Sequence, residues 1–120
     1  MAQLTVSSIT QSGLALTMSA SSSNGDSFSN TGAQAVLFQN SSSQGGGSSI
    51  TVTFAATKVD DYGGAASLHN VAVVLASSSM VLTAVGPFRP SYFNDANGLV
   101  QFTYSAAGLY VKAVQMAQAS

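Results

Sequence analysis

The residues of this chain that could do chemistry are few. It has one histidine, His69, no cysteine, and four acidic residues, all of them aspartates. An enzyme needs a nucleophile, an acid or base, or a metal, and a metal site here would lack companion ligands. His69 could pair with a serine and with Asp60 or Asp61, but no Gly-x-Ser-x-Gly elbow exposes such a serine. We therefore expect no enzymatic activity and no cofactor.

Two segments invite a ligand-binding interpretation that their surroundings do not support. The glycine-rich residues 41–49 are not followed by the Gly-Lys-Ser/Thr of a phosphate-binding loop, and residues 50–54 alternate like a strand. Asp60 and Asp61 are adjacent, but a Ca²⁺ ion usually takes roughly six to eight oxygen ligands, and the spacing does not follow an EF-hand. Both segments are predicted to be loops.

Residues 86–93, the corner segment, are the one candidate for recognition. Its two prolines cannot donate to a strand ladder, so the segment must leave the sheet or follow its edge. Arginine and aromatic side chains are enriched at interface hot spots. Two interpretations stay open: the rings fold under the domain and close the end of its core, or at least one of them contacts a partner. The candidate interface residues are Phe88, Arg89, Tyr92 and Phe93.

The low charge of the chain limits its partners. Charged residues make up 6% of the chain and the net charge is −1, which leaves no electrostatic footprint for nucleic acid or an anionic membrane. No apolar run approaches the roughly 20 residues of a membrane helix, and the start lacks a secretory pattern, so we expect assembly in a cytoplasm. Because 46% of the residues are hydrophobic, we expect a homo-oligomer, a trimer first and a dimer as the alternative.

The positions named above must be held by strands. Short alternating segments separated by turn residues predict one domain over residues 1–120, an all-β antiparallel β-sandwich or jelly roll of about seven to nine strands. Residues 19–30 are polar and are predicted to form a surface loop, in which Asp26, like Asp95 later in the chain, caps backbone amides. The expected strands are the start of the chain around Leu4 and Val6, then residues 14–18, 32–40, 50–54, 68–76, 80–85, 99–104 and 109–116.

Short links predict which strands pair. Residues 68–76 and 80–85 are expected to form an antiparallel hairpin through a turn at residues 77–79. Residues 99–104 and 109–116 are expected to form a second one through Ala106, Ala107 and Gly108. Because residues 71–75 are apolar on both faces, that strand is predicted to be central or to lie at a subunit contact.

The stretch from residue 86 to residue 105 has a pattern of its own. It reads GPFRPSYFNDANGLVQFTYS, and its recurring positions are Gly86, Pro87, Phe88, Pro90, Phe93, Asp95, Gly98, Val100, Phe102, Tyr104 and Ser105. Together with the strand at residues 50–53 and the closing strand from Gly108 to Val114, this pattern resembles small structural proteins of tailed bacteriophages.

The resemblance implies a role in the virion. It implies a capsid cement or decoration protein, bound to the major capsid protein on the outside of the head, with no catalytic residues. The alternative is a tail- or fibre-associated β module that recognises a host surface or a carbohydrate. Tryptophan platforms favour sugar binding, and this chain has no tryptophan.

Overall fold

The computed structural model describes residues 2–40, 49–57, 70–76 and 82–116. Within these residues the chain is mostly β, and its helix has four residues. No helix in the described residues is long and apolar enough to cross a membrane. The elements are β1 (Ala2–Leu4), β2 (Val6–Ile9), β3 (Ser19–Ala20), β4 (Asp26–Ser29), β5 (Gln34–Asn40), β6 (Ile50–Phe54), β7 (Val71–Leu75), β8 (Leu82–Val85), α1 (Pro90–Phe93), β9 (Leu99–Tyr104) and β10 (Leu109–Met116).

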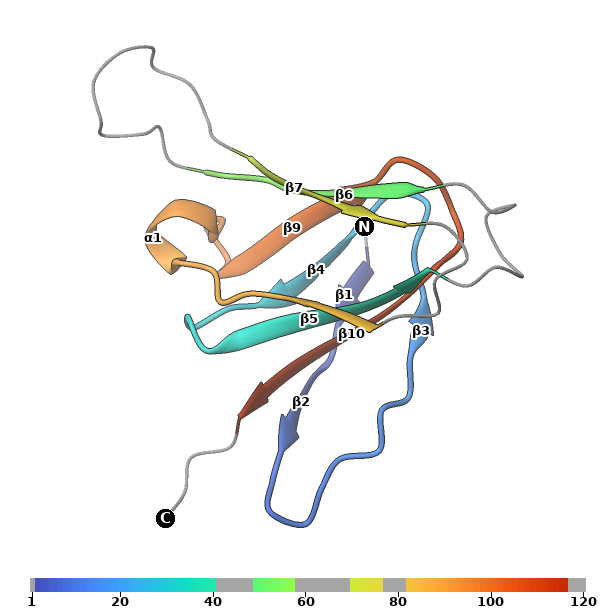
Figure 1. Ribbon diagram of the computed structural model, residues 1–120. Helices are drawn as coiled ribbons and strands as arrows, with labels where there is room; N and C mark the ends of the chain where they lie inside the picture. The colour runs from blue at the N-terminus through green and yellow to red at the C-terminus, as the bar shows by residue number, and fades with distance from the viewer. Residues whose placement is uncertain (1, 41–48, 58–69, 77–81, 117–120) are drawn as a thin grey trace.

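The strands form two five-stranded sheets (Figure 1). Sheet A has the order β1-β4-β9-β6-β7, and sheet B has the order β2-β10-β5-β8, with β3 also paired to β10. The prediction of purely antiparallel sheets is wrong, because β1 runs parallel to β4 and β2 runs parallel to β10. Long stretches of chain separate β1 from β4 and β2 from β10. Two strands must run antiparallel only when a short hairpin joins them, so these pairs can be parallel.

Both predicted hairpins are wrong. β9 pairs with β4 and β6 in sheet A, whereas β10 pairs with β5, β2 and β3 in sheet B. In the same way β7 pairs with β6, and β8 pairs with β5; the turn expected at residues 77–79 lies outside the described residues. Alternation identifies a strand but not its neighbour. A short link can cross the roughly 10 Å between stacked sheets as easily as it can close a hairpin.

The N-terminal third also departs from the predicted pattern. Residues 14–18 form no strand, and residues 19–30, predicted as a surface loop, contain β3 and β4. The side chain of Phe28 in β4 is fully buried. A single large ring is enough to anchor a short strand whose other residues are polar, because burying a phenylalanine contributes about 1.5–3 kcal/mol.

β7 is the edge strand of sheet A rather than a central one. Its outer face is open, since Val74 is 66% exposed. The prediction of a central strand is therefore wrong. The alternative prediction, a subunit contact, remains a proposal.

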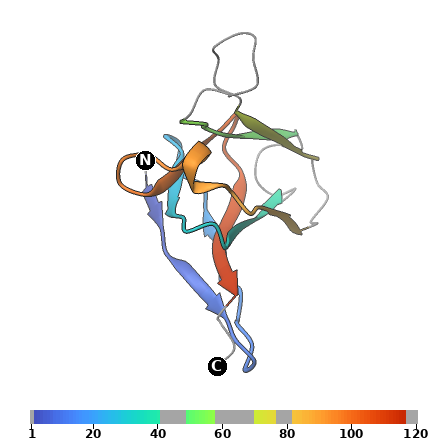
Figure 2. The same cartoon turned by 90° about the vertical axis from the view of Figure 1, so that its left-hand side faces the viewer.

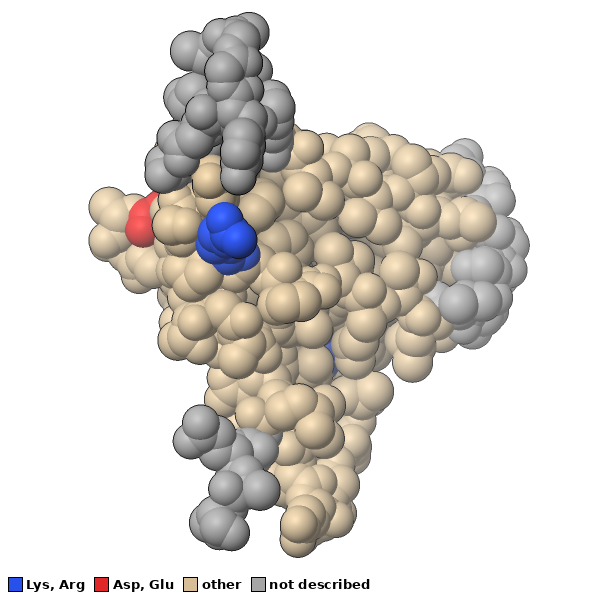
Figure 3. All heavy atoms as spheres, turned by 60° about the vertical axis from the view of Figure 1, so that its left-hand side comes forward, with Lys and Arg blue, Asp and Glu red and all other residues tan. Residues whose placement is uncertain are grey.

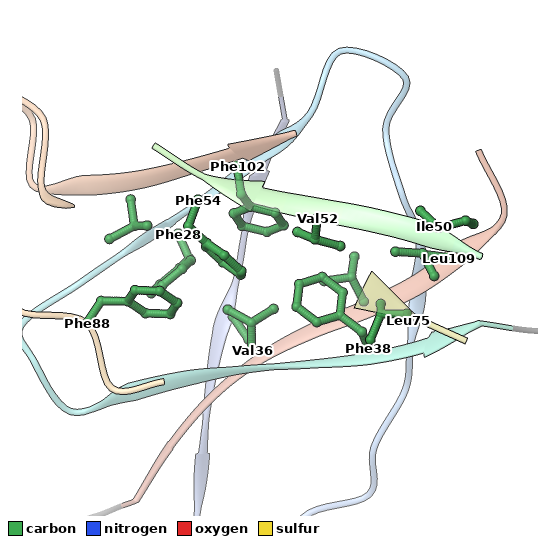
Figure 4. Close-up of a cluster of buried hydrophobic side chains, with 13 residues drawn as sticks. Phe28, Val36, Phe38, Ile50, Val52, Phe54, Leu75, Phe88, Phe102 and Leu109 are labelled. Carbon is green, nitrogen blue, oxygen red and sulfur yellow. The ribbon is translucent and has the colours of Figure 1, made fainter. Parts of the chain in front are cut away.

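The core lies between the two sheets and is centred on phenylalanine rings (Figure 4). The Phe102 ring lies 4.9 Å from Phe54 and 5.8 Å from Phe38, measured between centroids. The predicted strands at residues 32–40 and 50–54 are confirmed, and both bury alternate residues: Val36 and Phe38 of β5 point inward, as do Ile50, Val52 and Phe54 of β6. The other fully buried apolar side chains are Phe28, Val100, Leu109, Val111 and Ala113.

Candidate functional site

The corner segment leaves sheet B after β8 and closes one end of the molecule (Figure 1, Figure 2). Gly86 has a φ of +147°, and a side chain there would meet the backbone oxygen of Gln34 at 2.8 Å. Only glycine fits so close to β5. Pro90 then begins α1, where its missing N–H costs no hydrogen bond. The prediction that the segment leaves the sheet is confirmed.

Phe88 belongs to the core. It is 4% exposed, and its ring centroid lies 4.6 Å from Phe54, 5.8 Å from Phe28 and 5.3 Å from Phe93. These contacts correspond to the first interpretation of the corner segment, in which its rings close the end of the core. Phe93 is partly buried against the same cluster.

A pair of asparagines fastens the corner segment to β4. The Asn30 Nδ2 donates to the Phe88 backbone oxygen at 3.0 Å and to the Asn94 Oδ1 at 2.7 Å. The Asn94 Nδ2 in turn donates to the Asn30 backbone oxygen at 2.8 Å, and the Asn30 Oδ1 accepts from the Gly32 amide at 3.0 Å. Sequence reasoning missed both residues, because asparagine beside glycine also occurs in ordinary surface turns.

Arg89 and Tyr92 form the outer surface of the corner segment. Arg89 is exposed, and its guanidinium carbon lies 5.2 Å from the centroid of the half-buried Tyr92 ring. The Tyr92 backbone oxygen accepts from the Thr57 amide at 2.6 Å, which fixes the helix against the end of β6. Among the described residues, few charged atoms lie on this side of the molecule (Figure 3). Of the four candidate residues, Arg89 and Tyr92 are therefore placed best to reach a partner.

Asp95 has the structural role predicted for it. Its Oδ1 accepts from the Asn97 amide at 2.8 Å and the Leu99 amide at 3.0 Å, and its Oδ2 accepts from Gln101 at 2.7 Å. The Leu99 amide, followed by the Gln101 side chain, holds the pKa of Asp95 below its ordinary value. The carboxylate shapes the turn into β9.

Asp26 accepts a hydrogen bond from a backbone amide, as predicted, but the predicted surface loop around it is wrong. It lies in β4 and is 1% exposed. Its Oδ2 accepts from the Tyr104 hydroxyl at 2.5 Å and from the Ser22 amide at 3.2 Å. Burial, then the hydrogen bond to Asp26 and its charge, raises the pKa of Tyr104 well above the ordinary 10.0. A neutral tyrosine that donates to a carboxylate satisfies a buried charge.

The Tyr104 pair predicts a loss of stability in strong alkali. The folded protein holds Tyr104 neutral, so the stabilisation is fully present below the unfolded pKa of 10.0 and falls as pH rises above it. We expect the free energy of unfolding to drop by up to about 1.4 kcal/mol per pH unit there. Urea denaturation between neutral pH and pH 11 measures this. Tyr104→Phe should remove the part of the fall in unfolding free energy with pH that Tyr104 contributes. If that variant loses stability with pH as steeply as the unchanged protein, Tyr104 is not the group responsible.

The two outer faces of the sheets differ in character. On sheet A the outward side chains of the inner strands β6 and β9 are mostly hydroxyl or amide groups, such as Thr51, Thr53, Gln101 and Thr103. The outer face of sheet B carries a shallow apolar groove of about 230 Å³. We call it the sheet B patch; it is lined by Ile9, Ala33, Ala35, Leu37, Ala84, Val114, Gln115 and Met116.

Within the described residues, no group of three or more His, Cys, Asp or Glu residues comes together that could hold a metal ion. Asp60, Asp61, His69 and residues 41–48 lie outside those residues. Comparisons with protein-family models, curated proteins and solved structures found no match.

Proposed function

We propose that this protein is a structural protein of a tailed-bacteriophage virion, a cement or decoration protein bound to the outside of the major capsid protein shell. The observation that carries the proposal is the contrast between the two outer faces. The inner strands of sheet A present mostly uncharged polar groups outward, whereas sheet B carries the apolar sheet B patch, which suits a protein with one face to solvent and one to a neighbour. A cement protein needs such a face and no reaction chemistry.

The apolar face extends across the strands of sheet B. At its two ends Leu82 in β8 is 49% exposed and Met116 in β10 is 69% exposed, and both lie on the side of the sheet that carries the sheet B patch. When a partner covers exposed apolar side chains of this size, the water around them is released. This burial of apolar surface favours association. The sheet B patch is the surface we assign to the shell or to a sister protomer.

The strand order supports the same proposal through its architecture. Without β1 and β2, sheet A reads β4-β9-β6-β7 and faces β3-β10-β5-β8, and every one of these ladders is antiparallel. We propose that these eight strands are a jelly roll, with β1 and β2 added along its edge. Jelly rolls recur in viral capsid and lectin domains. The architecture therefore supports a capsid protein by analogy, and a fold alone does not establish a function.

Self-association is part of the proposal. A homotrimer is favoured and a dimer is the alternative, because several weak contacts made together raise the effective affinity for a repeating shell. Each contact should bury more than about 1,000 Å² in total. The open edge of β7 is a further surface at which subunits could meet. Light scattering that gives the mass of one chain at high micromolar concentration would contradict self-association.

Leu82→Ser should weaken binding without unfolding the protein. Loss of an exposed apolar contact at an interface costs about 1–2 kcal/mol, or roughly five- to thirtyfold in affinity, whereas the free energy of unfolding should stay within about 0.5 kcal/mol. The measurements are binding to expanded empty heads and oligomer mass. Leu16→Ser is the matched control, since Leu16 is exposed to a similar extent, 42% against 49% for Leu82, but lies between β2 and β3 rather than on β8. Equal effects of the two changes would contradict the assignment of the sheet B patch.

The place of the protein on the particle is tested separately. A cement protein should occur in purified virions in amounts that match the shell subunits. A few copies per particle would instead favour the alternative, a tail- or fibre-associated module for host-surface or carbohydrate binding. Absence from the particle would remove both versions of the proposal.

A further inference from the structure

A groove of mixed polar and apolar lining opens beside β10. It lies on the edge of β10 that pairs with β2 and β3, two strands from the N-terminal part of the chain (Figure 1). Its volume is about 350 Å³. We call it the β10 groove; it is lined by Gln3, Leu4, Thr5, Thr17, Ser19, Val111, Lys112 and Ala113. It shares no lining residue with the sheet B patch.

The groove follows from the way two strands share one side of β10. Ser19 of β3 pairs with Val111, and Val6 of β2 pairs with Ala113. Neither β2 nor β3 places a residue opposite Lys112. A gap therefore remains along this edge of β10, between the ladder with β3 and the ladder with β2. Thr5, where the chain crosses from sheet A to sheet B, borders that gap. The walls are therefore held by backbone ladders on both sides.

Lys112 brings an uncompensated charge into this groove. It is half-buried, and no carboxylate of the described residues forms an ion pair with it. Its ladder partner on β5 is Leu37. Arg89, the other cation in the described residues, instead lies against the ring of Tyr92. A cation beside neutral hydroxyl and amide groups attracts an anion, and partial burial reduces screening by salt.

We propose that the β10 groove binds an acidic monosaccharide, a pyranose ring that carries one carboxylate. One ammonium group matches one carboxylate, and a site for phosphate chains or nucleic acid would need more cations. The hydroxyl groups of Thr5, Thr17 and Ser19 both donate and accept, as a ring bearing hydroxyl groups requires.

The size and floor of the groove fit the same ligand. Leu4, which is half-buried, is the one apolar side chain of the lining that is partly exposed and can contact the C–H face of the ring; Val111 and Ala113 are fully buried and contribute only backbone atoms. The volume is at the lower end of the range of about 300–1,000 Å³ found for small-molecule sites. This inference goes beyond the proposed function, and it holds whether the protein lies on a head or on a tail.

The experiment is an NMR titration of the full isotope-labelled chain with D-glucuronate, D-glucose and acetate as probes. D-Glucuronate should bind with a dissociation constant on the order of 1 mM, as expected for a ligand of this size with few contacts. Shifts should appear at Thr5, Thr17 and Lys112. D-Glucose lacks the charge and acetate lacks the ring, so each should bind at least about tenfold more weakly. Added salt should weaken the binding of both anions, glucuronate and acetate, and should leave glucose binding unchanged.

Variants separate the contributions of charge and hydroxyl. Lys112→Gln keeps most of the side chain and should lower glucuronate affinity about tenfold, to the level of glucose. Arg89→Gln is the matched control, because it removes the same charge outside the groove and should change nothing. Thr17→Val removes one hydroxyl at nearly constant shape and should weaken glucuronate and glucose alike.

Three results would overturn the proposal. Equal affinity for acetate and glucuronate would reduce the site to a simple anion site, and equal affinity for glucose would remove the role of Lys112. Absence of shifts at the groove, in a chain whose spectrum and melting temperature show it to be folded, would remove the site altogether. Binding to empty heads is unaffected by any of these results, so the proposed function stands or falls separately.

Discussion

Phe88→Ala should lower the free energy of unfolding by about 3–5 kcal/mol, the usual cost of removing a buried phenylalanine ring. The ring is 4% exposed and contacts three other phenylalanines, Phe28, Phe54 and Phe93. Its removal leaves a cavity at the end of the core that the proline-stiffened corner segment cannot collapse to fill. For a domain of this length the melting temperature should fall by about 10–20 °C, which thermal denaturation measures directly.

Arg89→Ala and Tyr92→Ala are the matched controls for that experiment. Both side chains lie on the outer surface of the corner segment, so each change should cost less than about 1 kcal/mol of stability. Binding to expanded empty heads is measured beside stability for all three variants. If Phe88→Ala leaves the melting temperature unchanged, the ring does not close the core. If no variant loses binding without also losing stability, the corner segment is core alone and the interface lies elsewhere.

Asn30→Ala should lower the free energy of unfolding by about 3 kcal/mol, because it leaves buried polar groups without partners at about 1–3 kcal/mol each. The Phe88 backbone oxygen and the Asn94 Oδ1 lose a donor, and the Gly32 amide loses an acceptor. Urea denaturation measures the change. The corner segment should also loosen, since Asn30 joins it to β4.

Two further variants define the cause of that loss. Asn30→Asp keeps the shape but turns a donor into a carboxylate that faces two acceptors, so it should be at least as destabilising as alanine. Asn97→Ala removes an exposed asparagine from a turn and should stay within about 0.5 kcal/mol of the unchanged protein. If Asn30→Ala also lowers the free energy of unfolding by no more than about 0.5 kcal/mol, water has replaced the hydrogen bonds of Asn30.

Local pattern was enough to predict the strands that build the core. The alternation of Ile50, Val52 and Phe54 with threonines gave both the strand and its buried face, because the period of a strand is two residues. The same reasoning located β5, and the residues around Asp95 gave its turn. In each case the deciding interactions lie within a few positions along the chain.

Local pattern could not predict which strands pair with each other, or which residues hold the corner segment in place. Nothing in the alternation of β9 and β10 says that they lie in different sheets. Asn30 and Asn94 are 64 positions apart, and no local feature distinguishes them from the other asparagines. For the candidate site, the chain indicated that the corner segment is special, but only three-dimensional packing separates Phe88 inside from Arg89 outside.

The crossing of the chain between sheets also bears on how the domain folds. Among the described strands, β6 and β7 are the one hydrogen-bonded pair that is consecutive in the chain. The single strand β10 pairs with three others, β2, β3 and β5. A hydrogen bond between Gln115 of β10 and Ser8 of β2 joins residues that are 107 positions apart. Pairing over such distances places folding at the slow end for small domains, from milliseconds to seconds. During synthesis β2 and β3, whose one partner among the described strands of sheet B is β10, must wait for it, so sheet B can be completed only after nearly the whole domain has left the ribosome.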